Sequence, residues 1–457
     1  MASKPQHIHI VGICGVATSA LAIAFQKKGW KVTGSDKGFF PPVSTELEKH
    51  KVSFYAGWHP ENMGTPDVVM MGGVGTSPSN PEIIYAKEKN IPVFAYAEIL
   101  EKYFIKKNSI VTAGTWGKTT SSSLLSFILI EAGMDPSYFT GGLSLSHDTG
   151  ALSDSDWSVV EGDEYQVSIS DKRPKFIYYS PTHLLLTSVS WDHADLYPTE
   201  ANYFKVFEDL VASTNMIVAC NDDKGVKKVL KDKKAVTYGK TDAADYCYHD
   251  VQHTKSGLSF IIANKGAEYK VSSPMLGRFN AENIAGAFAM ACEIGIDPKV
   301  AIDAIQNFKG IKRRFEKRLE GKITLLDCHA PTAEKAASVL ESIREVYDKK
   351  IVAVYEPNIG GRSRESAIKY DNAFKNADLV IIPRLTKLKT SNKEAPMEGD
   401  ELASTIAKNQ PNTRYIEDDT ELVRTLISEA KNEGDTIVFL GSHGFRGMIE
   451  ETIKSLS

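Results

Sequence analysis

Short apolar runs recur along the whole chain, and an amphipathic stretch follows most of them. This alternation of strand-length and helix-length patterns predicts α/β architecture, with parallel sheets flanked by helices. The runs that we expect to be strands are His7–Val11, Lys31–Ser35, Val68–Met71, Val93–Ala95, Ser109–Ala113, His183–Val189, Ile323–Leu326, Ile351–Tyr355, Leu379–Ile382 and Thr436–Leu440.

Two basic, polar stretches interrupt this pattern and divide the chain into three blocks. They are Lys106–Asn108 and the segment from Lys309 to Lys322, each of which precedes a new strand. A chain of 457 residues is also too long for one compact core, because domains usually hold about 100–200 residues. We therefore predict three domains, at residues 1–106, 107–318 and 319–457.

Composition and charge narrow the class of protein. Hydrophobic residues make up 42% and charged residues 25%, as in ordinary globular proteins. The formal net charge of −4 argues against non-specific nucleic-acid binding. No apolar run approaches the ~20 residues of a membrane helix, and no apolar signal segment opens the chain, so we expect a cytoplasmic protein without a membrane partner. The five cysteines form no CxxC pair, so neither a zinc site nor a disulfide framework is indicated.

A glycine-rich segment, Ala113–Thr120, lies between an expected strand and a helical run at Ser121–Ala132. Backbone N–H groups of such a loop cradle phosphates, and the helix N-terminus adds a positive dipole end. We predict that Lys118 reaches the β- and γ-phosphates of ATP and that Thr119 holds Mg²⁺. Thr112 stands where the strict motif has glycine, so a helix cap with incidental glycines is the alternative. The residues expected to contact the nucleotide are Gly114, Thr115, Gly117, Lys118, Thr119 and Thr120.

Acidic side chains follow two of the expected strands. Three carboxylates lie in the segment Val159–Tyr165, directly after an apolar run, and the strand His183–Val189 leads into a turn with a histidine between two aspartates. Crowded acids are costly unless a cation neutralises them, although a solvated acidic turn has the same composition. Because parallel strands deliver these side chains to one sheet edge, we predict that Glu161 and His193 bind a divalent metal together with Thr119.

A second glycine turn, Gly12 to Gly15, follows the first expected strand and opens a helix. It has a GxxG pattern, because Cys14 occupies the place of a middle glycine. Asp36 ends the next strand, at the spacing of an acid that binds a ribose. The pattern fits NAD and also fits the diphosphate of a UDP-sugar, and a purely structural tight turn is a third interpretation.

Taken in this order, the motifs resemble those of the Mur ligases, and the likeness covers nearly the whole chain. The Gly-Thr-Trp-Gly-Lys-Thr-Thr loop is similar to the family's ATP loop, where histidine is usual at the position of Trp116. Gly277–Asn283 is similar to the family's Gly-x-His-Asn-x-x-Asn segment, whose asparagines lie against ATP. Phe308–Glu316 resembles the segment closing the central domain, where an arginine reaches the phosphates.

The resemblance implies an N-terminal Rossmann-like domain for a UDP-sugar, a central P-loop ATPase-like domain, and a C-terminal Rossmann-like domain that receives an amine. It implies an ATP- and Mg²⁺-dependent ligase that joins an amine to the carboxylate of UDP-N-acetylmuramate through an acyl phosphate. The implied catalytic residues are Lys118, Glu161, His193 and Arg314; Asn280, Asn283 and Arg314 would bind ATP; Gly12, Gly15, Asp36 and Glu164 would bind the UDP-sugar; Asp327 and His329 would serve the amine-substrate domain.

Within the family, the likeness is strongest to the branch that attaches the free tripeptide L-alanyl-γ-D-glutamyl-meso-diaminopimelate during wall recycling. The branch that adds L-alanine is the alternative. The stretches that favour the tripeptide branch are His9–Gly15, Val32–Asp36, Pro41–Thr45, Glu161–Tyr165, Asp171–Phe176, Asp192–Asp195 and Gly441–Gly447.

The chain also departs from the family. The C-terminal motif, Leu326–Thr332, is one residue shorter before its histidine and lacks the second histidine, and Glu356–Arg362 replaces a Glu-Pro-Arg-Ser-Asn segment. An asparagine is missing from the stretch Thr187–Val189, and Phe207 stands where some members carry a carbamylated lysine. The ATP machinery is therefore better supported than the identity of the amine. An NAD-dependent oxidoreductase and a nucleotide-binding regulator without catalysis stay open as alternatives.

Overall fold

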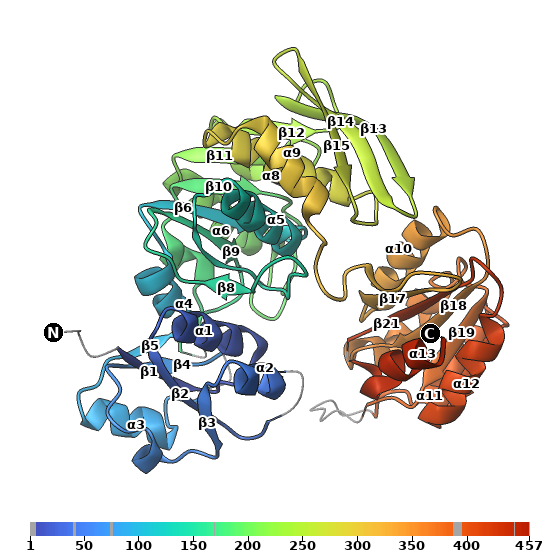
Figure 1. The fold of residues 1–457 in the computed structure, drawn as a ribbon, viewed down its shortest axis with the longest axis horizontal. Coiled ribbons are helices and arrows are strands. Elements are labelled where there is room, and N and C mark those ends of the chain that lie inside the picture. The colour runs from blue at the N-terminus through green and yellow to red at the C-terminus, as the bar shows by residue number, and fades with distance from the viewer. Residues whose placement is uncertain are drawn as a thin grey trace. The chain divides into compact units, whose positions relative to one another are not determined.

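The computed structural model describes residues 6–39, 43–73, 76–168, 170–386, 395–442 and 444–456. It contains three sheets, coloured from blue to red along the chain in Figure 1, and helices flank each of them. Pro41, Pro42 and His443, which contribute to the sequence resemblance, lie outside the described residues. In the described part of the chain, no helix combines the length and apolar character needed to cross a membrane.

The N-terminal sheet has five strands in the order β3-β2-β1-β4-β5, all parallel. Every residue of the central strand β1 is buried, including His7 and His9, whose rings both hydrogen-bond with the Thr33 hydroxyl on β2. The strands are β1 (His7–Val11), β2 (Lys31–Asp36), β3 (Ser53–Ala56), β4 (Val68–Met71) and β5 (Val93–Ala95), and the helices are α1 (Val16–Lys27), α2 (Val43–Lys49), α3 (Pro81–Glu88) and α4 (Tyr96–Ile99).

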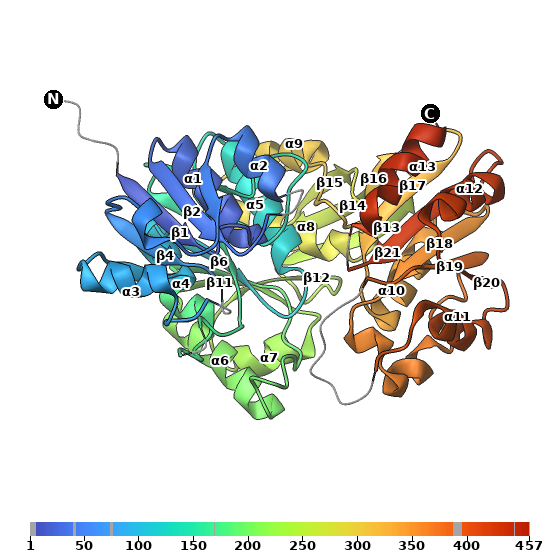
Figure 2. The ribbon, with the colours of Figure 1, turned by 90° about the horizontal axis from the view of Figure 1, so that it is seen from below.

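The middle sheet has ten strands in the order β15-β14-β13-β12-β11-β10-β6-β9-β7-β8. Figure 2 shows α6 and α7 on one face of this sheet and α5, α8 and α9 on the other. The strands are β6 (Asn108–Ala113), β7 (Ser137–Phe139), β8 (Gly150–Ala151), β9 (Trp157–Gly162), β10 (His183–Leu186), β11 (Met216–Cys220), β12 (Val236–Gly239), β13 (Tyr246–Thr254), β14 (Gly257–Asn264) and β15 (Ala267–Ser273). The helices are α5 (Lys118–Glu131), α6 (Glu200–Ser213), α7 (Lys224–Leu230), α8 (Asn280–Glu293) and α9 (Pro298–Asn307).

The C-terminal sheet has six strands in the order β16-β17-β21-β18-β19-β20, and only β16 pairs antiparallel to its neighbour among the pairings described. The strands are β16 (Glu316–Leu319), β17 (Thr324–His329), β18 (Ile351–Glu356), β19 (Leu379–Pro383), β20 (Thr413–Ile416) and β21 (Thr436–Gly441). The helices are α10 (Ala333–Arg344), α11 (Gly399–Ala407), α12 (Asp419–Glu429) and α13 (Met448–Leu456). The predicted α/β class with three mostly parallel sheets is confirmed, whereas β16 spans the predicted boundary at residue 318, and the boundaries stay predictions.

Internal contacts divide the chain into two compact units. The first comprises Met1–Asp250, Phe260–Ser272 and Ala281–Lys309, and the second comprises Val251–Ser259, Ser273–Asn280 and Gly310–Ser457. Within the first unit, one cluster of buried apolar side chains extends from β1 through β6 to α6. The N-terminal sheet and the core of the middle sheet are therefore packed together, so a ligand site can include side chains of both.

One helix and one strand have bounds that differ from the predicted ones, and both differences lie at the site. The helix expected at Ser121 begins at Lys118, because the loop before it ends at a glycine in the left-handed region. The strand expected to reach Val189 ends at Leu186, because Thr187 turns toward the loop, where its hydroxyl bonds to the carbonyl oxygens of Ala113 and Trp116.

Candidate active site

The loop between β6 and α5 is shaped by two glycines that no other residue could replace without strain. Gly114 has φ 144° and Gly117 has φ 85°, both in the left-handed range. A Cβ atom on Gly114 would lie 2.3 Å from the Thr187 Oγ1 atom, and one on Gly117 would lie 2.5 Å from the Asn283 Oδ1 atom. The loop is therefore in close contact with β10 on one side and with α8 on the other.

Hydroxyl groups after β10 hold this loop in place. The backbone N–H of Trp116 donates to Ser188 Oγ at 2.9 Å, and the backbone N–H of Ser190 donates to Thr115 Oγ1 at 2.9 Å. The stretch that lacks the family's usual asparagine thus still fixes the loop, through hydroxyls instead of an amide. The Trp116 side chain itself projects outward and is 60% exposed.

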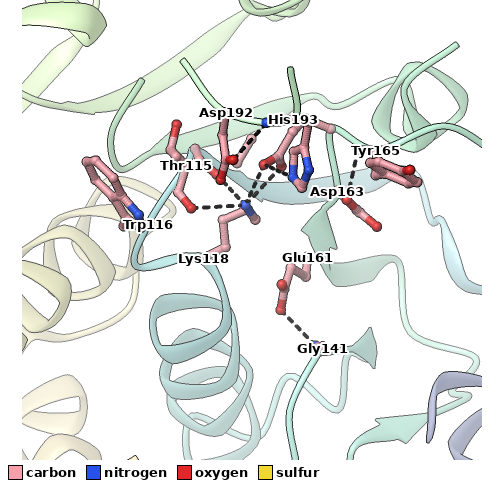
Figure 3. Close-up of polar contacts among 12 residues, drawn as sticks. Thr115, Trp116, Lys118, Gly141, Glu161, Asp163, Tyr165, Asp192 and His193 are labelled. Carbon is pink, nitrogen blue, oxygen red and sulfur yellow. Dashed lines mark hydrogen bonds and ion pairs between the residues drawn. The ribbon is translucent and has the colours of Figure 1, made fainter. Parts of the chain in front are cut away.

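Lys118 begins α5 and points back across the loop toward a buried acid (Figure 3). Its Nζ atom lies 2.9 Å from Glu164 Oε2 and also donates to the carbonyl oxygens of Gly114 and Thr115. Glu164 is only 2% exposed. The cation therefore has a carboxylate partner in a place where a phosphate-binding lysine is expected to meet phosphate oxygens.

The charge of Glu164 is maintained despite its burial. Burial by itself would raise the pKa of Glu164, but a hydrogen bond from His193 and the charge of Lys118 outweigh this effect and lower that pKa. The His193 Nε2 atom lies 3.5 Å from Glu164 Oε1, and this contact is the main reason that the pKa of His193 is raised. Lys118, Glu164 and His193 thus form a row in which both outer side chains contact the acid, and the hydroxyl of Tyr203 adds a hydrogen bond to Glu164 at 3.3 Å.

Glu161 and Thr119, two of the three predicted metal ligands, are directly adjacent. The Thr119 hydroxyl donates to Glu161 Oε1 at 3.0 Å, and the Gly141 N–H donates to Glu161 Oε2 at 2.7 Å. The third, His193, contacts Glu164 instead. Figure 3 shows Glu161 on the opposite side of Lys118 from His193.

This oxygen pair fits magnesium better than a metal that needs several protein ligands. In the described part of the chain, no group of three or more His, Cys, Asp or Glu side chains is arranged to hold a metal ion. Mg²⁺ usually takes one or two protein oxygens and completes its shell with water and phosphate oxygens. Thr119 and Glu161 are donors of this kind, beside the phosphate loop.

The remaining predicted nucleotide and amine residues are distributed over both units. Asn283, on α8, lies against Gly117, and Asn280 donates its side-chain amide to the Leu276 carbonyl oxygen at 2.7 Å. In the second unit, the Arg314 N–H donates to the Ile311 carbonyl oxygen, and Asp327 and His329 end β17. The structure thus brings Asn283 to the phosphate loop, while the roles of Arg314, Asp327 and His329 stay predictions.

Asp327 is buried against a basic group within the second unit. Burial raises its pKa, although the guanidinium of Arg313, with Nε 3.3 Å from Asp327 Oδ1, acts in the opposite direction. Arg313 also donates to the carbonyl oxygens of Gly441 and Ser442. The end of β17 is therefore tied to the end of β21 by one arginine.

The N-terminal glycine turn lies at one end of a cavity of about 1030 Å³ in the first unit. The Cys14 N–H donates to Asp36 Oδ2 at 2.8 Å, so this carboxylate supports the turn. The cavity extends from Gly12, Gly15 and Asp36 to the middle sheet, where Gly141, Glu161, Asp163 and Lys175 line it. Of the four predicted UDP-sugar residues, Gly12, Gly15 and Asp36 line this cavity, whereas Glu164 lies with Lys118 instead.

Sequence reasoning missed several residues of this site. Tyr203 and Gly141 reach it from segments without a recognisable motif, and Ser188 was visible only as a departure from the family. Lys175 was not predicted as a site residue, although its stretch is among those that resemble the tripeptide branch. The one available sign was the basic stretch Asp171–Phe176, which contains Lys175. Long-range contacts of this kind have no fixed spacing in the sequence.

Three mostly parallel sheets, with a phosphate loop and paired acids at the carboxyl edge of the middle one, define a P-loop enzyme that acts on a nucleotide. Models of three Mur ligase domains match the chain: "Mur ligase family, catalytic domain" at residues 7–107, "Mur ligase middle domain" at 111–291 and "Mur ligase, glutamate ligase domain" at 313–443.

Full-length relatives agree with these matches. A UDP-N-acetylmuramate–L-alanine ligase from Paenarthrobacter aurescens is 31% identical over 457 residues, covering 95% of this chain and 94% of that one. The crystal structure of a UDP-N-acetylmuramate–alanine ligase from Thermotoga maritima has the same fold, with a TM-score of 0.80, 22% identity and 99% of each chain covered. A UDP-N-acetylmuramate:L-alanyl-γ-D-glutamyl-meso-diaminopimelate ligase from Neisseria meningitides is 26% identical, with a TM-score of 0.59, over 68% of this chain and 100% of that one.

The chain belongs to the Mur ligase family. It is an ATP-dependent ligase that forms a carbon–nitrogen bond, as members of this family are. The predicted family and class of reaction are confirmed. The curated relatives bear names of L-alanine ligases, so they favour the alternative branch over the tripeptide branch that the sequence stretches suggested.

Proposed function

We propose that this enzyme joins L-alanine to the carboxylate of UDP-N-acetylmuramate, with ATP and Mg²⁺, in the cytoplasmic assembly of peptidoglycan precursors. The observation that carries the proposal is the 31% identity to an L-alanine ligase over 95% of the chain. The phosphate loop and the adjacent Thr119–Glu161 pair supply the chemistry that such a ligase requires.

Activation of the carboxylate is the first step. A carboxylate oxygen of the acceptor attacks the γ-phosphorus of ATP, the bond to the β-γ bridging oxygen breaks, and ADP leaves with that electron pair. The products are an acyl phosphate and ADP. Backbone N–H groups at the N-terminus of α5 would hold the phosphates, because a helix N-terminus presents several donors together, whereas the N–H groups of Thr115 and Trp116 bond to Ser188.

Lys118 would change partners when the nucleotide binds. In the structure its ammonium group lies 2.9 Å from Glu164. In the complex it would meet the transferring phosphoryl group, where a preorganised cation stabilises the charge of the transition state. Glu164 would then keep the hydrogen bond with His193, so that its negative charge would not be left unpaired.

Magnesium would bind at Thr119 and Glu161. Both are hard oxygen donors beside the loop, and the ion when bound would neutralise phosphate charge. The Gly141 N–H holds the second Glu161 oxygen and would keep the carboxylate oriented.

Amide formation is the second step. The neutral amine attacks the acyl carbon, a tetrahedral intermediate collapses, and phosphate leaves while the nitrogen loses a proton. The acyl phosphate must be protected from water during this time. We assign the reception of the amine to the C-terminal domain, with Asp327 and His329 as candidate residues at the end of β17.

The tripeptide is the second candidate amine. The stretch Asp171–Phe176 resembles the tripeptide branch, and the Neisseria tripeptide ligase is 26% identical over 68% of this chain. The Paenarthrobacter L-alanine ligase is 31% identical over 95% of this chain, whereas the Neisseria tripeptide ligase is 26% identical over 68% of it. We therefore rank L-alanine first.

An amine panel tests the proposal. Purified protein is incubated with UDP-N-acetylmuramate, ATP and Mg²⁺, and with L-alanine, the tripeptide, glycine or no amine, while phosphate release and product mass are followed. We expect release with L-alanine and a product whose mass equals acceptor plus L-alanine minus water. Product with the tripeptide alone would establish the second candidate, and phosphate release without product under every amine would contradict both.

A further inference from the structure

Lys175 is a buried lysine on the wall of the cavity, and neither the motifs nor the relatives assign it a role. It begins a short 3-10 helix, η3 (Lys175–Tyr179), and only 9% of it is exposed. Lysine is almost never buried without a partner, and here Asp163 Oδ2 lies 2.6 Å from the Nζ atom. Both residues line the cavity that starts at the Gly12–Gly15 turn.

The ion pair with Asp163 is not what holds this segment in place. The Lys175 N–H donates to the Tyr165 carbonyl oxygen at 3.1 Å, and the Phe176 N–H donates to the Asp163 carbonyl oxygen at 3.3 Å. The Phe176 ring is buried against Phe207, with ring centroids 5.5 Å apart. Backbone and apolar contacts therefore position Lys175, so its charge is available for another purpose.

The charged side chains near Lys175 indicate that it can bind a ligand anion. Glu161 also lines the cavity, but its oxygens accept from Thr119 and Gly141. The Asp163 side chain is 42% exposed, so water can compensate it when Lys175 changes partner. A ligand anion that enters the cavity would find in Lys175 a cation with an exchangeable counter-ion.

The position of Lys175 in the cavity indicates which part of the ligand it would contact. A nucleotide sugar with its diphosphate at the Gly12–Gly15 turn would extend toward Glu161, beside the phosphate loop. The group that must reach that end is the acceptor carboxylate, because it reacts with the γ-phosphate there. Resting on the proposed function, we propose that Lys175 binds the carboxylate of UDP-N-acetylmuramate and holds it in line with the phosphoryl group.

Two ligands that differ by the lactyl group, which carries the carboxylate, provide the test. UDP-N-acetylglucosamine is the same nucleotide sugar without the lactyl group that carries the carboxylate. Binding of both is measured by calorimetry, with Mg²⁺ present, for the wild type and for Lys175→Met, Lys175→Arg and Lys172→Met. Lys172 lies three residues earlier and is exposed, which makes it a matched control.

We expect Lys175→Met to weaken UDP-N-acetylmuramate binding about 10- to 100-fold, as loss of a charge-assisted hydrogen bond does, and to leave UDP-N-acetylglucosamine within about twofold. Lys175→Arg should retain most of the preference, and Lys172→Met should retain all of it. Equal weakening of both ligands by Lys175→Met, or no change in either, would overturn the inference.

Asp163→Asn separates a ligand contact from a structural ion pair, and it also covers the case in which Lys175→Met does not fold. If the pair were only structural, removing either partner would affect both ligands alike. Under the inference, Asp163→Asn keeps the preference for the carboxylate ligand, because Lys175 is still present. A wild-type protein that binds both ligands equally would instead contradict the proposed acceptor, which is a different failure.

Discussion

The first unit contains two glycine turns with the same architecture and different chemistry. One joins β1 to α1 at Gly12–Gly15, and the other joins β6 to α5 at Gly114–Gly117. Each follows an interior strand with parallel neighbours and opens a helix; the first turn has one glycine in the left-handed region, Gly12, and the second has two, Gly114 and Gly117. Both therefore present a helix N-terminus to a ligand, while N–H groups within each turn bond to neighbouring segments of the protein.

The difference lies in the charged side chains beside each turn. At the first turn, Asp36 accepts the N–H of Cys14, and no lysine follows the second glycine. At the second turn, Lys118 follows directly, with the exchangeable partner Glu164. A phosphate that is only held needs backbone donors, whereas a phosphate that is transferred also needs a mobile cation and a metal.

The largest expected effect is the loss of that cation. Lys118→Met should reduce ATP-dependent phosphate release by about 10³-fold or more, because a preorganised charge on the transferring group is removed. Release is measured at saturating substrates, together with UDP-sugar affinity by calorimetry, which should change by less than about twofold.

The control for this variant is Lys205→Met, since Lys205 lies exposed on α6 and pairs with Asp209. It should have nearly wild-type turnover. A Lys118→Met enzyme with turnover near that of this control would show that the two turns do not differ as described.

The second effect concerns the metal. Glu161→Gln should lower turnover about 100-fold and raise the Mg²⁺ concentration for half-maximal activity about 10-fold, because an amide is a weaker ligand than a carboxylate. Titration of activity with Mg²⁺ measures both changes. Asp36→Asn, at the other turn, should leave the Mg²⁺ dependence unaltered; a shift of similar size in both variants would contradict the assignment.

A smaller effect is expected for Asp36 itself. Its two oxygens accept the N–H groups of Cys14 and Lys37, at 2.8 and 2.7 Å, and an asparagine could replace only one of these acceptors. Asp36→Asn should raise the KM for the UDP-sugar about 5- to 10-fold and leave kcat within about twofold, because it loosens a turn that only binds. Initial rates over a range of UDP-sugar concentrations test this, and a lower kcat with unchanged KM would contradict it.

The two turns also differ in how much of them the sequence predicts. Their backbone could be predicted, because strand, glycines and helix are contiguous in the chain. The partners could not, because they come from distant segments: Glu164 is 46 residues beyond Lys118, and Tyr203 is 88 residues beyond Thr115. His193, expected beside Thr119 and Glu161, contacts Glu164, and the predicted metal set stays a prediction. At the end of β17, the segment Leu326–Thr332 departs from the family motif, so the sequence could not predict which amine is bound.

The smallest expected effect is a pH dependence of stability at the second turn. Glu164 raises the pKa of His193 above its ordinary value of about 6.5. The stability that protonated His193 contributes is therefore fully present below about pH 6.5 and is lost as the pH rises through the pKa of the folded state. The pKa of Glu164 is lowered, so its contribution is present above about 4.5 and is lost only as pH falls below that. Their ion pair is therefore strongest between those two values.

Thermal unfolding of His193→Gln and the wild type tests this. The wild-type advantage in Tm should be on the order of 1 °C near pH 6 and should shrink toward pH 9, because the pair is partly exposed. His183→Gln is the opposite case, since burial lowers the pKa of His183 and its contribution is lost as pH falls. If the Tm differences of both variants followed the same trend with pH, the row of Lys118, Glu164 and His193 would not carry the charges assigned to it. The second turn would then lack the exchangeable acid that distinguishes it from the first.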